Sequence, residues 1–151
     1  MALASCLVDT NILLRATRRA DPQHQVASTG LARLANQGTL LYYAPQNIAE
    51  LWNTMTRPAA RNGLGLSVVE ADREVRAIEN GMILLPDNEA VYREWRRIIV
   101  QHAVLGVQVH DARLAASMGE YSQDMIGQII EIVNELNGFQ YLGIGHKTQS
   151  Q

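Results

Sequence analysis

Three acidic residues stand where their carboxylates could share a divalent cation. Asp9 follows a short apolar run, Glu50 lies on a helical pattern, and Asp111 is expected near the start of a later helix. A hard cation such as Mg²⁺ binds several oxygen ligands and can draw them from distant parts of a chain. Taken singly, Asp9 and Asp111 fit helix N-caps, and Glu50 fits a solvated helical side chain. The conjunction of the three predicts a metal site.

The elements that must position these acids alternate between short strands and amphipathic helices. Residues 3–8 predict a buried strand that ends at Asp9, where a helix begins. This order predicts an α/β fold with a central parallel sheet of four or five short strands and helices on both faces. Active groups in such sheets lie at the carboxyl ends of strands, as Asp9 would. Further strands are expected at 40–43 and 82–85, with helices at 23–37, from Pro45 to before Pro58, at 67–78, and from a cap at Asp87 or Asn88.

The hydrophobic pattern of the C-terminal part fits more than one type of secondary structure. Residues 126–136 favour a helix, although 129–133 would also fit a strand. Residues 141–144 are expected to form a last strand.

Composition limits the class of protein. The chain has 151 residues, of which 47% are hydrophobic, and this supports one well-filled domain. A net charge of −2 excludes coating of nucleic acid through bulk charge, so any RNA contact must be local. The lone cysteine, Cys6, and the lack of an export signal or membrane-length apolar run predict a cytoplasmic protein without a membrane span.

The cationic side chains are arginines except for Lys147. Arginine presents a planar fork that suits phosphate oxygens. Arg15 follows the first acidic motif and Arg57 follows the second, so both are candidate contacts to RNA phosphates. An ordinary solvated surface that favours arginine is the alternative explanation.

Another reaction class would use Asp9 as a nucleophile. Aspartate-nucleophile phosphatases also place their reactive aspartate at the end of a strand. They commonly use a second aspartate two residues further on, and this position is Asn11 here. The phosphatase interpretation is therefore the weaker alternative.

Three segments together resemble a known family. Residues 7–15 (LVDTNILLR), 45–53 (PQNIAELWN) and 106–114 (GVQVHDARL) resemble the successive motifs of PIN-domain ribonucleases, in particular the VapC toxins of toxin–antitoxin pairs. The match runs in order from Leu3 to about Met118. Residues 56–58 and 62–67 also resemble one bacterial branch of that family.

The resemblance implies both a site and an activity. Asp9, Glu50 and Asp111 would be the catalytic, metal-binding acids, with Thr10 or Asn11 steadying Asp9 through hydrogen bonds. The cofactor would be Mg²⁺, with Mn²⁺ as a substitute, and the reaction would be hydrolysis of RNA phosphodiester bonds to leave a 5′-phosphate and a 3′-hydroxyl. The implied partners are an RNA substrate, a small antitoxin protein and a second copy of the chain in a homodimer.

The sequence departs from the family after Met118. A further strand followed by another acid is usual there, and the position falls on Asn137 or, in a poorer match, on Asp124. We therefore expect a single PIN-like domain over residues 1–145, in which residues 119–151 form an atypical C-terminal segment. A PIN domain that binds RNA or antitoxin without efficient cleavage is the main alternative to an active nuclease.

Overall fold

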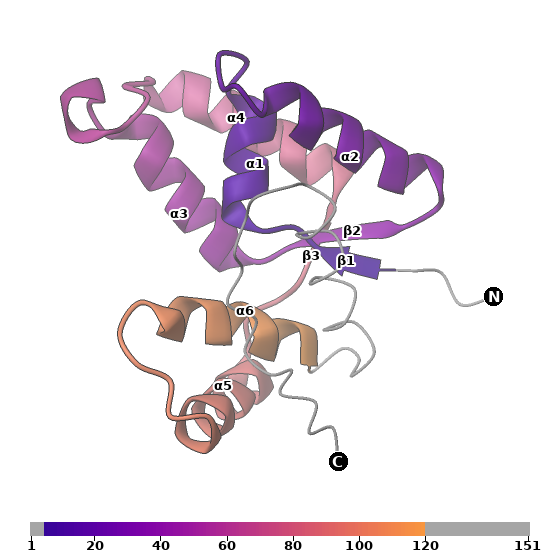
Figure 1. The fold of residues 1–151 in the computed structure, drawn as a ribbon, viewed down its shortest axis with the longest axis vertical. Helices are drawn as coiled ribbons and strands as arrows, with labels where there is room; N and C mark the ends of the chain where they lie inside the picture. Colours follow the sequence, from indigo (N-terminus) through magenta and orange to yellow (C-terminus); the bar gives the residue numbers. More distant parts are fainter. Residues whose placement is uncertain (1–4, 120–151) are drawn as a thin grey trace. The chain divides into compact units, whose positions relative to one another are not determined.

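The computed structural model describes residues 5–119, and these fall into two compact units, 5–85 and 86–119. The α-helices and strands of each unit are labelled in Figure 1. None of the helices within residues 5–119 is both long and apolar enough to cross a membrane. The first unit contains β1 (Ser5–Leu7), α1 (Thr10–Thr17), α2 (His24–Asn36), β2 (Leu40–Tyr43), α3 (Pro45–Thr56), the 3-10 turn η1 (Ala59–Arg61), α4 (Val68–Gly81) and β3 (Ile83–Leu84), and the second contains α5 (Glu89–Gln101) and α6 (Gln108–Gly119).

A parallel sheet forms the base of the first unit. Its strands lie in the order β1-β2-β3, with Cys6 opposite Leu41 and Tyr42 opposite Ile83. Helices connect the successive strands, as parallel strands require. The predicted α/β class and parallel sheet are confirmed for these three strands. A fourth or fifth strand stays a prediction, because residues 126–136 and 141–144 lie outside the described residues.

Helix α3 carries Glu50 and is fixed by its apolar face. Pro45 occupies the first turn, where its missing N–H costs no hydrogen bond. Leu51 and Met55 are fully buried, at 0% exposure, while Glu50 is half-buried beside them. Burial of these two side chains stabilises the helix through the hydrophobic effect. The backbone position of Glu50 is therefore set by the core.

Helix α4 begins at the predicted capping box. The Ser67 hydroxyl accepts a hydrogen bond from the Glu70 N–H at 3.2 Å, and the Glu70 carboxylate accepts one from the Ser67 N–H at 2.8 Å. Its end lies at Gly81, three residues beyond the predicted Ile78. The Met82 N–H still donates to the Ile78 carbonyl at 2.9 Å, so the last turn remains hydrogen-bonded.

The second unit is a pair of packed helices. Asn88, one of the two predicted caps, accepts a hydrogen bond from the Val91 N–H at 3.0 Å at the start of α5. The Trp95 indole N–H donates to the Val109 carbonyl at 3.0 Å and ties α5 to α6. The buried contact between the helices is made by Val91, Ile98, Ala112 and Ala116.

The predicted start of α6 near Asp111 is corrected by the structure. This helix begins at Gln108, so Asp111 lies inside the first turn and is not the N-cap. Hydrogen bonds from the Gln108 and Val109 N–H groups to the carbonyls of Leu105 and Gly106 start the helix earlier. An acidic side chain in the first turn still interacts favourably with the helix dipole.

Candidate functional site

Asp9 lies two residues after the end of the first strand, Leu7, and caps the next helix. Its backbone is extended, with φ −68° and ψ 150°, and its Oδ2 accepts a hydrogen bond from the Asn11 N–H at 3.2 Å. The side chain is half-buried. This cap bond holds a carboxylate at the start of α1, where the positive end of the helix dipole stabilises negative charge.

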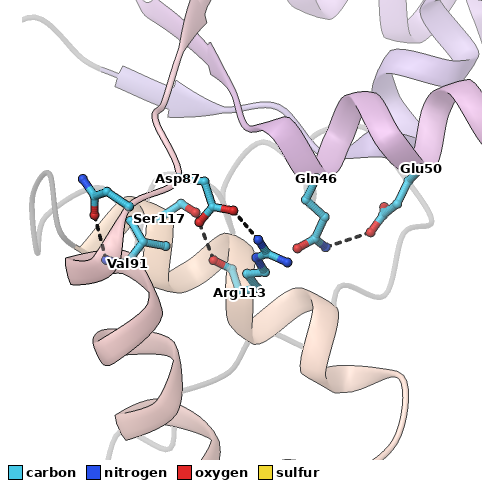
Figure 2. A network of polar contacts seen from close by, with 7 residues as sticks. Gln46, Glu50, Asp87, Val91, Arg113 and Ser117 are labelled. Carbon is cyan, nitrogen blue, oxygen red and sulfur yellow. Dashed lines mark hydrogen bonds and ion pairs between the residues drawn. The ribbon is translucent and has the colours of Figure 1, made fainter.

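Glu50 is held through both of its carboxylate oxygens. The Thr10 hydroxyl donates to Oε2 at 2.8 Å. The Gln46 amide, one turn earlier on α3, donates to Oε1 at 2.7 Å, and Figure 2 shows this contact. An ionised carboxylate has about four lone-pair sites, so these two bonds orient it and leave capacity for further ligands.

Asn47 is the buried hydrogen-bond partner of Thr10. Its side chain is fully buried, at 0% exposure. The Asn47 Nδ2 donates to the Thr10 hydroxyl oxygen at 3.1 Å, and its Oδ1 accepts from the Ala44 N–H at 2.7 Å. The start of α1 is thereby connected to the turn before α3 and to Glu50.

The hydrogen bonds divide the two residues that the resemblance implied would steady Asp9. Asn11 donates to Asp9 through its backbone N–H. The Thr10 hydroxyl donates to Glu50. The contacts of Gln46 and Asn47 were not predicted from the sequence. The spacing of four residues between Gln46 and Glu50 is a signal that places these two side chains on one helix face.

Asp111 belongs to the second unit. It is half-buried in the first turn of α6. On the same helix, Arg113 forms an ion pair with Asp87, and its carbonyl accepts from the Ser117 hydroxyl at 3.1 Å; Figure 2 shows both contacts. Within either unit taken alone, residues 5–119 contain no group of three Asp, Glu, His or Cys side chains that could hold a metal ion.

The two arginines expected to contact RNA phosphates also contact the chain itself. Arg15 donates to the Gln23 side chain, and its carbonyl lies 2.9 Å from the His24 Nδ1, which links α1 to α2. Arg57 donates to the Asn62 carbonyl at 3.0 Å.

The loop after Arg57 is closely packed. A Cβ on Gly63 would lie only 1.9 Å from the Arg57 carbonyl oxygen, so this position requires glycine. The backbone of Arg57 therefore packs against Gly63, while its guanidinium binds the Asn62 carbonyl of the same loop.

Comparison with known families identifies the family of the chain. The model of the PIN domain matches residues 6–126, which include Asp9, Glu50 and Asp111. The chain belongs to the PIN domain family. PIN domains are typically metal-dependent nucleases, so family membership assigns a hydrolase of nucleic acids at this coarse level. No curated protein matches the chain.

Two carboxylates of the first unit offer the kind of donor atom that a hard divalent cation prefers. Asp9 and Glu50 supply carboxylate oxygens from elements of one unit, and Mg²⁺ or Mn²⁺ prefers such ligands. Burial raises the pKa of the Cys6 thiol to about 12, so this thiol is protonated at neutral pH. Asp124 and Asn137, considered for a further acidic position, lie outside the described residues.

Proposed function

We propose that the chain is a metal-dependent endoribonuclease in which Asp9, Glu50 and Asp111 bind Mg²⁺, or Mn²⁺ in its place. Membership of the PIN family supports a nuclease. The assignment of Glu50 as a metal ligand rests on two hydrogen bonds, from Thr10 and Gln46, which orient its carboxylate. A carboxylate held at both oxygens is pre-ordered for a cation.

The residues of the first unit have separate tasks in this proposal. Asp9 supplies a carboxylate fixed by the cap bond of α1, and Glu50 supplies one fixed by two side chains. A bound divalent cation would lower the pKa of a water and neutralise charge that develops on the scissile phosphate. Arg15 and Arg57 remain candidate contacts to RNA phosphates, beside their contacts to the chain.

The biological role proposed is that of a VapC-type toxin in the cytoplasm. The motif resemblance supports it, because residues 7–15, 45–53 and 106–114 follow the order and spacing of those toxins. The role includes a small antitoxin protein as partner and a homodimer as the assembly. Co-purification with the product of a short neighbouring gene would test the antitoxin.

Cleavage of end-labelled structured RNA by the full chain tests the catalytic proposal. With Mg²⁺ or Mn²⁺ we expect cleavage that EDTA abolishes and that Asp9→Asn lowers by about 100-fold. Asparagine caps helices as well as aspartate does, so this variant removes charge while keeping the cap of α1. Asp72→Asn is the matched control, because Asp72 lies on α4 in a surface ion pair.

The outcomes separate the alternatives. Cleavage that survives EDTA, or that is equal in Asp9→Asn and the wild type, contradicts a metal site at Asp9. Retained RNA binding without cleavage by the wild type would instead identify a PIN domain with weakened catalysis. Covalent labelling of Asp9 by a phosphate analogue would support the phosphatase.

A further inference from the structure

A continuous chain of hydrogen bonds runs from the backbone before α3 to the Glu50 carboxylate. The Ala44 N–H donates to Asn47 at 2.7 Å, Asn47 donates to Thr10 at 3.1 Å, and Thr10 donates to Glu50 at 2.8 Å. Asn47 is 0% exposed and Thr10 is 9% exposed. Water therefore does not compete for the bond between Ala44 and Asn47 or for the bond between Asn47 and Thr10.

The direction of each bond is fixed by the chemistry of its groups. An amide oxygen only accepts and an amide NH₂ only donates. Because the Ala44 N–H occupies the Asn47 oxygen, the Asn47 NH₂ faces Thr10. The Thr10 oxygen then accepts from Asn47, and its single proton is directed to Glu50.

We infer that Asn47 is a positioning residue, which acts through Thr10 to hold the Glu50 carboxylate in the orientation that binds the cation. This inference rests on the proposed role of Glu50 as a metal ligand and adds to it a residue that does not touch the metal. Partners behind a metal ligand orient it, and their loss commonly lowers metal affinity by about 10–100-fold.

A purely structural role for Asn47 makes a different prediction. In that case its bond to the Ala44 N–H would matter, and the bond to Thr10 would not. Replacing Asn47 would then lower the stability of the fold and leave the metal affinity of the folded protein unchanged. Metal affinity is therefore the readout that separates the two roles.

A double-mutant cycle on the full chain tests the inference, with the dissociation constant for Mn²⁺ measured by the EPR signal of the free ion. We expect Asn47→Leu and Thr10→Val each to weaken binding by about tenfold, and Thr10→Ser, which keeps the hydroxyl, to bind as the wild type. The double variant should bind no more weakly than Thr10→Val alone, because Asn47 acts through the missing hydroxyl. Asn53→Leu, on the exposed face of α3, is the matched control.

Each result decides a separate claim. Equal affinities of Asn47→Leu and Asn53→Leu, or additive effects in the double variant, would overturn the inference and leave the role of Glu50 intact. Failure of Glu50→Gln to weaken Mn²⁺ binding would overturn the proposed function itself.

A second variant covers the case in which Asn47→Leu does not fold. Asn47→Asp keeps an acceptor for the Ala44 N–H and lacks the donor to Thr10. Its carboxylate would also compete with Glu50 for the proton of the Thr10 hydroxyl, so it should weaken Mn²⁺ binding when Thr10 is present and lose that part of its effect in the Thr10→Val background. Non-additivity is again expected, and additivity would again overturn the inference.

Discussion

The polar contacts around Glu50 differ in kind from those on the surface of α5. Glu50 is joined to Thr10, 40 residues away in the sequence, by a part-buried hydrogen bond. Glu89 is joined to Arg93, four residues away, and both side chains are about three-quarters exposed, at 75% and 76%. Exposed pairs contribute about 0–1 kcal/mol, whereas loss of a buried partner leaves a desolvated group unsatisfied. The same residue type thus makes a part-buried contact between distant segments in one region and an exposed local ion pair in the other.

The largest expected effect comes from comparing these two glutamates directly. Glu50→Gln should lower Mn²⁺-dependent RNA cleavage by about 100-fold, because it removes a charged oxygen ligand. Glu89→Gln should change it by less than about twofold, since it removes only an exposed pair. Initial rates on one labelled RNA measure both. Similar cleavage rates for the two variants would contradict a specific role of Glu50 in cleavage.

The two asparagines of α3, Asn47 and Asn53, should likewise differ in how much they stabilise the fold. Asn47→Leu should lower the free energy of unfolding by about 2 kcal/mol, because the buried Ala44 N–H loses its acceptor. Asn53→Leu should lower it by less than about 0.5 kcal/mol, as expected for an exposed position. Urea denaturation provides both values. A cost for Asn53→Leu as large as that for Asn47→Leu would show that burial does not set the difference.

The parts predicted from sequence depend on local signals. Pro45 starts α3 and Ser67 with Glu70 caps α4, because each signal acts within one helical turn. Asp9 could be placed at a strand end because an apolar run stops there. Local patterning therefore predicted the three described strands and most helix bounds.

The rest depends on contacts between distant segments. Asn47 looks like one more polar residue on a helix, and its partner Thr10 is 37 residues away. The sequence pattern places the start of α6 too late because backbone bonds to Leu105 and Gly106 set it, and no strong cap marks it. The orientation of Glu50 could not follow from the pattern of α3 alone.

The capping box of α4 is intermediate between the contacts of Glu50 and the exposed ion pairs. It joins residues close in sequence, as the ion pairs do, but through two reciprocal hydrogen bonds. Backbone and side-chain hydrogen bonds from Ser67 lower the pKa of Glu70. A carboxylate with a lowered pKa stabilises the fold above its unfolded-state pKa and loses that contribution as the pH falls through its folded-state pKa. Ser67→Ala should cost about 1 kcal/mol at neutral pH. The difference from the wild type should narrow in acid, as measured by urea midpoints at several pH values; a widening would contradict this linkage.

The smallest effect is expected at the Asp72–Arg76 pair of α4. Its atoms approach to 2.7 Å, but its side chains are 46% and 72% exposed. Arg76→Gln should therefore lower the free energy of unfolding by less than about 0.5 kcal/mol. The difference should vanish in about 1 M salt, where the screening length falls to about 3 Å. Thermal or urea unfolding at low and high salt measures it. A salt-independent cost above about 1 kcal/mol would mean that short distance, and not burial, decides which polar contacts matter here, and the contrast with Glu50 would then fail.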